Sequence, residues 1–269
     1  MKSNSIRLSI IGGGVMAEAI LSRLLVQQVF TPSSVLVSEP QAARRDYLAQ
    51  KYQVQVTAAN QTAISEAGIL LLAVKPQILD LVVADLTPNP QSTVISILAG
   101  ITIAKLEQAF PQQPVIRVMP NTPATVGAGM TAIAPGTSAQ PEHLAQAKSI
   151  FAAVGEVVEV SESSMDAVTG LSGSGPAFVA LAIEALADGG VASGLPRAIA
   201  LQLATQTVLG TATLVKQTGI HPGVLKDQVT SPGGTTIAGV AKLESVGFRS
   251  ALIEAVKTAT ARSQELGQQ

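Results

Sequence analysis

The stretch Arg7-Leu8-Ser9-Ile10-Ile11-Gly12-Gly13-Gly14-Val15-Met16-Ala17 decides the fold of the first half of the chain, and an apolar-periodic segment follows it. It predicts a strand, a glycine turn and a helix in succession, the setting in which G-x-G-x-x-A holds a dinucleotide. Gly12 permits the tight turn, Gly14 lets a pyrophosphate approach the backbone, and Ala17 allows the helix to pack closely on the strand. The alternative is a glycine-rich turn without a ligand.

More apolar runs follow at residues 34–37, 69–74, 94–97 and 115–118, separated by segments typical of helices. Runs that are apolar throughout predict strands buried on both faces of a parallel sheet. Two further β-rich pieces flank a predicted helix at 141–153 and complete the sheet, at residues 130–134 and 156–160. We therefore predict an α/β fold, with an N-terminal Rossmann-type doubly wound sheet over residues 1–160. Such sheets bind ligands at the carboxyl ends of their strands, so one crevice is expected beside Gly12, Ser38, Lys75, Ala99 and Met119.

After Ser161 the pattern changes to helices only. Residues 161–269 therefore form a second, all-α domain, with helices predicted at 177–187, 196–217, 224–229, 236–245 and 250–266. The helix over 196–217 avoids charge on both faces, which favours a subunit interface over an ordinary core helix.

Composition excludes several classes of protein. The chain is 47% hydrophobic and 13% charged with a net charge of −1, which argues against binding nucleic acid and indicates apolar surface buried between subunits. It has no cysteine and two histidines, so thiol chemistry is excluded and we expect no metal site. The N-terminus lacks the layout of a signal peptide, and the longest uncharged run, 198–215, is short for a membrane helix. We expect a cytoplasmic protein without a membrane partner.

A second glycine turn lies near the C-terminal end, at Ser231-Pro232-Gly233-Gly234-Thr235-Thr236. Pro232 cannot continue a helix, and the glycines can take positive φ, so the backbone turns sharply. Thr235 or Thr236 is expected to cap the next helix. Free N–H groups at that helix end would attract a carboxylate. The alternative is an ordinary loop between two helices.

Several motifs together resemble the pyrroline-5-carboxylate reductase family, in order along nearly the whole chain. They are Ala-Val-Lys-Pro at 73–76, Arg-x-Met-Pro-Asn-Thr-Pro at 117–123, Leu-Ser-Gly-Ser-Gly-Pro-Ala at 171–177, His-Pro-Gly-x-Leu-Lys-Asp at 221–227 and Ser-Pro-Gly-Gly-Thr-Thr at 231–236. The resemblance implies an oxidoreductase of proline biosynthesis. It would reduce 1-pyrroline-5-carboxylate to L-proline by hydride transfer from NAD(P)H to a cyclic imine. It also implies a homodimer formed through the C-terminal helices, assembled in many relatives into a larger ring.

The resemblance extends the cofactor site beyond the glycine turn. The residues it implicates are Gly12, Gly13, Gly14, Val15, Met16, Ala17, Ser38, Asn60, Ala73, Val74, Lys75, Pro76, Ala99, Gly100, Met119 and Asn121. At the end of the second strand, Glu39 would repel a 2′-phosphate, whereas Ser38, Arg44 and Arg45 could receive one. Family preference favours NADP(H), with NAD(H) as the alternative. The two arginines would equally suit a solvated helix face.

In hydride transfer the nicotinamide supplies the reactive group, and the protein orients and polarises the reactants. We predict that the hydroxyl of Thr236 hydrogen-bonds the ring nitrogen of the imine. Ser231 and the backbone of Gly233, Gly234 and Thr235 would hold the substrate carboxylate, and the resemblance adds Ser172 and Ser174 as substrate-binding residues. His221, which precedes Pro-Gly, is expected to be structural.

Two other functions compete with this interpretation. A β-hydroxyacid-type dehydrogenase also joins a Rossmann-type domain to a helical one. Enzymes of that type resemble one another in carrying a catalytic lysine on a helix of the second domain, and the comparable residues here, 172–188, contain no lysine. A nucleotide-sensing regulator would keep the glycine turn and have no reason to retain the loop at 231–236.

Overall fold

The computed structural model of the chain describes residues 6–84 and 86–267. These residues form two compact units, one containing those up to Gly173 together with those from Thr258 onward, and the other spanning Ser174–Lys257. The chain passes from the first unit to the second between Gly173 and Ser174. The predicted boundary at residue 160 marks instead the place where strands stop alternating with helices, and it stays a prediction.

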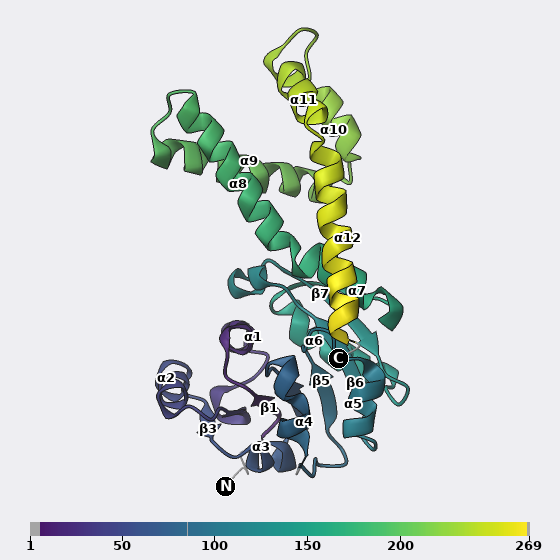
Figure 1. Cartoon of the computed structure of the whole chain (residues 1–269). Helices are drawn as coiled ribbons and strands as arrows, with labels where there is room; N and C mark the ends of the chain where they lie inside the picture. Colours follow the sequence, from purple (N-terminus) through teal and green to yellow (C-terminus); the bar gives the residue numbers. More distant parts are fainter. Residues whose placement is uncertain (1–5, 85, 268–269) are drawn as a thin grey trace. The chain divides into compact units, whose positions relative to one another are not determined.

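The first unit is built on an eight-stranded sheet with the order β3-β2-β1-β4-β5-β6-β7-β8. Figure 1 labels β1, β3, β5, β6 and β7 of this sheet. Neighbouring strands are parallel except for β6 and β7, which are antiparallel. The strands are β1 Leu8–Ile11, β2 Val35–Ser38, β3 Gln55–Thr57, β4 Ile69–Leu72, β5 Thr93–Ser96, β6 Val115–Met119, β7 Gly129–Pro135 and β8 Gly155–Glu159. The doubly wound sheet is confirmed, with β3 as an additional strand that the sequence analysis did not predict.

Helices cover both faces of this sheet because successive strand residues point to opposite sides. In β1, Leu8 and Ile10 enter one core cluster with residues of α1, α2 and α6, whereas Ile11 enters another with residues of α3, α4 and α5. The helices are α1 Val15–Val26, α2 Ala42–Tyr52, α3 Asn60–Glu66, α4 Leu79–Val83, α5 Ile103–Ala109, α6 Pro141–Ala152 and α7 Met165–Val168. Short 3₁₀ helices connect them: η1 Pro32–Ser34, η2 Pro76–Ile78, η3 Thr122–Val126 and η4 Glu162–Ser164.

The second unit is helical throughout, as predicted. It contains α8 Gly175–Ala192, α9 Arg197–Thr218, α10 Pro222–Gln228, α11 Thr235–Ser245 and the first turns of α12 Phe248–Gly267. A π-helical turn, η5 Thr169–Gly173, precedes α8. The structure describes all of residues 174–257, and only three alanines in them are buried: Ala187, Ala200 and Ala204. The unit therefore leaves its large apolar side chains exposed.

In the first unit, α1 and α2 are joined by the carboxylate of Glu18. Four side chains of α2 donate hydrogen bonds to it: Arg44 at 2.6 Å, Tyr52 at 2.7 Å, Tyr47 at 2.9 Å and Lys51 at 3.0 Å. Burial alone would raise the pKa of Glu18, but the hydrogen bonds from Tyr52, Arg44, Lys51 and Tyr47 outweigh it and lower the pKa from 4.5 to about 2. The folded protein therefore favours the ionised form.

This lowered pKa predicts how stability depends on pH. The pKa of Glu18 is lower in the folded state than in the unfolded chain, so its contribution is complete above pH 4.5 and is lost as the pH falls towards 2. Glu18→Gln should lower the free energy of unfolding by about 1 kcal/mol at pH 7. Urea unfolding of both proteins from pH 7 down to pH 3 measures the difference, which should shrink below pH 4.5. A difference that is constant over this range would contradict the prediction.

Candidate active site

The glycine turn of the first unit is held between two neighbouring strands. Gly12 has a φ of +98°, which favours glycine, and a Cβ on it would lie 2.7 Å from the carbonyl oxygen of Ala73. Its N–H donates to the carbonyl of Ser38 at 2.8 Å, and the N–H of Ala73 donates to Ile11 at 2.9 Å. Gly12 is thus tied to the ends of both β2 and β4.

Side chains of the segment after β2 hold both backbone groups of Gly13. Its N–H donates to Oε2 of Glu39 at 2.9 Å, and its carbonyl accepts from Nε of Arg44 at 2.6 Å. The second carboxylate oxygen of Glu39 accepts from the N–H of Gln41 at 3.0 Å, and Glu39 is 9% exposed. Glu39 and Arg44 were expected near a 2′-phosphate, with a solvated helix face as the alternative for Arg44, and their bonds to the turn were not predicted.

Gly14 leaves open space at the start of α1. It has φ −69° and ψ −174°, which any residue adopts, and a Cβ there would meet no heavy atom within 4 Å. No side chain caps the helix, so its first N–H groups face outward, at the end that favours an anion. Val15 is exposed, Met16 half-buried and Ala17 buried against the core. Nothing in the protein itself requires glycine at this position, whereas the close approach of a phosphate does.

The other predicted cofactor residues lie at the ends of β2, β4 and β5. Ser38 donates from Oγ to Oδ1 of Asn60 at 2.7 Å, which joins β2 to the start of α3. Lys75 is exposed and precedes η2, whose first residue is Pro76, and Ala73 and Val74 are half-buried beside Gly12. After β5, Ala99 is exposed, and Gly100 is buried against the last residues of α12.

Asn121 connects two of the motifs. Its Nδ2 donates to the carbonyl of Ser172 at 3.0 Å, and its Oδ1 accepts from the N–H of Met130 at 2.9 Å. Met119 adjoins Gly173, where a Cβ would come within 2.8 Å of the methionine Cε. The motifs at 117–123 and 171–177 therefore meet at η5, a π-helical turn of the kind often found at functional sites. Asn121 was predicted as a cofactor residue, and its amide is used to hold this turn.

In the second unit, the loop from Ser231 ends at the N-terminus of α11. Gly233 has a φ of +67°, and Gly234 donates its N–H to the carbonyl of Ser231 at 3.0 Å. Gly234 occupies the N-cap position with φ −80° and ψ 175°, so the expectation that Thr235 or Thr236 caps the helix is wrong. The turn at Gly233 brings the chain into the helix one residue earlier than expected. Thr235 is exposed and Thr236 half-buried, both in the first turn of α11.

His221 has a structural role in the second unit. It is the N-cap of α10, and its Nδ1 accepts a hydrogen bond from the N–H of Gly223 at 3.1 Å. The imidazole therefore stabilises the helix start.

The predicted site residues fall into two sets, one in each unit. The first unit holds every predicted cofactor residue and Ser172. The second holds Ser174, Ser231, Gly233, Gly234, Thr235 and Thr236. Among residues 6–84 and 86–267, no group of three or more His, Cys, Asp or Glu side chains could hold a metal ion.

Two family models match the chain, one over each half. Residues 7–100 match a family model described as NADP oxidoreductase coenzyme F420-dependent, and residues 162–266 match one described as pyrroline-5-carboxylate reductase dimerisation. The fold therefore combines the two expected domains, the α/β one and the all-α dimerisation one.

Two solved structures share this fold over almost their whole length. The pyrroline-5-carboxylate reductase of Coxiella burnetii aligns with a TM-score of 0.89 and 33% identity, covering 97% of this chain and 98% of that one. The Plasmodium falciparum pyrroline carboxylate reductase, crystallised with NADP bound, gives 0.89 and 30%, covering 98% and 99%. A prephenate dehydrogenase from A. aeolicus, at 0.53 and 12%, shares the fold alone.

Curated relatives bear the same name. The pyrroline-5-carboxylate reductase of Synechocystis sp. is 63% identical over 264 residues, covering 98% of this chain and 99% of the relative. The Arabidopsis thaliana enzyme of that name is 45% identical over 268 residues, covering 99% and 97%. The resemblance carried by the five motifs is thereby confirmed, and the chain belongs to the pyrroline-5-carboxylate reductase family.

Proposed function

We propose that this chain reduces 1-pyrroline-5-carboxylate to L-proline with NADPH, the last step of proline biosynthesis, in the cytoplasm. The observation that carries the reaction is the 63% identity over 98% of the chain to a reductase of that name. That match extends over nearly the whole chain and therefore over both domains.

The residues of the first glycine turn fit the cofactor. The empty space above Gly14 and the uncapped start of α1 suit a pyrophosphate. Ser38 and Asn60 would lie toward the adenosine ribose, and residues 73–76, 99–100 and 119 along the crevice at the strand ends. The bound cofactor supplies the hydride.

The second glycine turn is assigned to the substrate. The N–H groups of Gly233 and Thr235 donate no hydrogen bond within the described residues, so they are available to a carboxylate. The N–H of Gly234 is already donated to Ser231, which leaves it a part in shaping the loop rather than in binding. Ser231 and Ser174 would add hydroxyl donors, whereas the hydroxyl of Ser172 already donates to the carbonyl of Val168 at 3.1 Å and could only accept. A protonated imine is already an electrophile, so one hydroxyl, that of Thr236, suffices at the ring nitrogen, and positioning provides most of the rate.

Preference for NADPH is supported by the state of Glu39. Both oxygens of its carboxylate accept backbone N–H groups, so the charge that would repel a 2′-phosphate is turned inward and partly neutralised. Arg45 lies close by and supplies a positive charge, whereas Arg44 forms an ion pair with Glu18.

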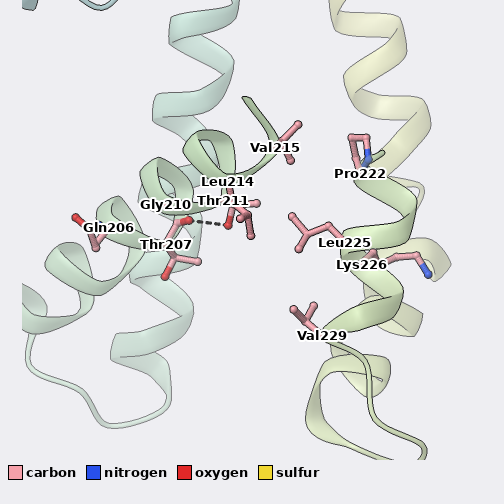
Figure 2. Close-up of a pocket in the computed structure, with 10 residues that line it drawn as sticks. All are labelled: Gln206, Thr207, Gly210, Thr211, Leu214, Val215, Pro222, Leu225, Lys226 and Val229. Atoms are coloured by element: carbon pink, nitrogen blue, oxygen red, sulfur yellow. Dashed lines mark hydrogen bonds between the residues drawn. The ribbon is translucent and has the colours of Figure 1, made fainter. Parts of the chain in front are cut away.

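The helical unit is proposed to form a homodimer with a second copy of this chain. Its exposed apolar side chains include Leu186, Leu203, Leu209 and Leu214. Of these, Leu214 lines a groove of about 470 Å³ between α9 and α10, together with Leu225 and Val229 (Figure 2). Lys226 is the one charged residue of that lining. An apolar surface of this extent, on a unit whose buried side chains are three alanines, is typical of an obligate interface.

By length and composition, α9 and the helical segment 162–192 are also apolar enough to cross a membrane. We propose that the apolar side chains of these helices contact the partner subunit rather than lipid. The family model that matches residues 162–266 is described as a dimerisation domain. A ring of dimers would be a further step of the same assembly.

Loss of the Thr236 hydroxyl tests the substrate assignment. Thr236→Ala should lower kcat/KM for pyrroline-5-carboxylate by about tenfold or more, because one hydrogen bond to a charged group contributes about 1–2 kcal/mol. Thr236→Ser keeps the hydroxyl and serves as the matched control, with most of the activity retained. Steady-state oxidation of NADPH measures both, and an unchanged kcat/KM in Thr236→Ala would remove Thr236 from the mechanism.

Cofactor preference is tested on the wild-type protein. We expect kcat/KM for NADPH to exceed that for NADH by about tenfold or more, since a charged group recognising the 2′-phosphate discriminates on that scale. Parallel titrations of the two cofactors at saturating substrate measure the ratio. A ratio of one or less would contradict the preference while leaving the reductase reaction intact.

A charge placed on the helical surface tests the dimer. Leu209 is 58% exposed on α9, and Leu209→Asp should convert the dimer to monomers or prevent folding, because the charge would be buried at the interface. Leu81, 81% exposed on α4 of the first unit, provides the control Leu81→Asp, which should stay dimeric. Light scattering after gel filtration without detergent measures the mass. A monomeric wild type, or a wild type that needs detergent, would contradict the proposal.

A further inference from the structure

The consecutive arginines of α2 have different environments. Arg44 donates from Nε to the carbonyl of Gly13 at 2.6 Å and from Nη2 to Oε2 of Glu18, also at 2.6 Å. Its charge is therefore balanced by a carboxylate, and its guanidinium is held against the glycine turn. With Glu39 on the N–H of the same glycine, Arg44 fixes the orientation of that peptide.

Arg45 lies beside the segment that follows β2. Its Nη1 donates to the carbonyls of Glu39 and Pro40, each at 2.8 Å. Its Nε and Nη2 have no hydrogen-bond partner, and its charge no acidic partner, within the described part of the chain. The side chain is half-buried, and its backbone contacts restrict where the guanidinium can lie.

The position of Arg45 is relevant to the cofactor because, in this fold, the residue at the end of β2 faces the 2′ position of the adenosine ribose. Ser38 is the last residue of β2, and Glu39 and Pro40 are the next two. The guanidinium of Arg45 is thus anchored at the strand end that distinguishes NADP from NAD. A guanidinium with two unused donor nitrogens suits a phosphate, since Arg binds it through parallel N–H groups.

We propose that the two arginines have different roles in cofactor binding. Arg45 recognises the 2′-phosphate of NADPH. Arg44 is a positioning residue that, with Glu18 and Glu39, holds the glycine turn in place for NADPH and NADH alike. This inference rests on the proposed preference for NADPH. It gives Arg45 a role in specificity and Arg44 a role in affinity for the part that both cofactors share.

Substitutions at the two adjacent positions separate these roles. In Arg45→Met the ratio of kcat/KM for NADPH over NADH should fall by about tenfold, and Arg45→Lys should restore much of it because the charge is kept. In Arg44→Met both values of kcat/KM should fall together, chiefly through KM, with the ratio within about twofold of wild type. Lys148→Met, on the exposed face of α6, controls for the loss of a surface charge.

Binding of cofactor fragments gives a readout that does not depend on turnover. Calorimetric titration with adenosine 2′,5′-bisphosphate and with adenosine 5′-monophosphate should show that Arg45→Met weakens the first by about tenfold and changes the second little. Arg44→Met should weaken both. Thermal melts of each variant verify folding, and Arg45→Lys keeps the test available if the methionine variant is unstable.

The results separate the roles of the two arginines from the proposed preference for NADPH and from the proposed reaction. A wild type without preference for NADPH overturns both the cofactor preference and the role of Arg45. A wild-type preference that survives Arg45→Met, or that Arg44→Met alone abolishes, overturns the division of roles and leaves the preference standing. Loss of pyrroline-5-carboxylate reduction in the wild type would instead overturn the proposed reaction.

Discussion

The close approach of Gly12 to the carbonyl of Ala73 is the constraint on which the cofactor site depends. Parallel pairing sets Ile11 opposite both Ser38 of β2 and Leu72 of β4, so the three strands end at the same level. The chain must then turn within one residue, at a distance from Ala73 that admits no Cβ. Because the strand order reverses at β1, this level edge is also the point where a doubly wound sheet opens to a ligand.

The helical unit depends on a different constraint, the lack of a core of its own. Burial of three alanines removes little apolar area, whereas leucines along α8 and α9 remain about half exposed. At roughly 25 cal/mol per Å² of apolar surface, covering those leucines contributes far more than the alanines do. A partner that covered those leucines, as proposed for a second copy of the chain, would couple folding of this unit to association and make its stability depend on protein concentration.

The sequence predicts well where apolar runs decide the structure and poorly where single backbone angles or exposed edges do. The strands β1, β4 and β5 are buried as expected, although β4 and β5 end at Leu72 and Ser96, before the ends of the predicted runs 69–74 and 94–97. A strand covered on both faces leaves a mainly apolar signal in the sequence. The strand Gln55–Thr57 escaped prediction because it is short, partly polar and at the edge of the sheet. The cap of α11 was assigned to a threonine because the left-handed turn at Gly233 cannot be read from residue types alone.

Gly14 and Gly234 occupy the same position at the starts of two helices, but the space around them differs. They cap α1 and α11 with nearly the same extended backbone, a conformation open to any amino acid, and neither helix has a side-chain cap. Elsewhere Thr102 and His221 accept N–H groups at the starts of α5 and α10. A serine or aspartate in place of Gly14 would cap α1 more strongly, and its Cβ would meet nothing. The glycine at position 14 is therefore explained by an anion in place of a capping side chain, which fits the proposed pyrophosphate. At Gly234, by contrast, a Cβ would lie 3.2 Å from the carbonyl oxygen of Ser231, so the tight turn itself favours glycine there.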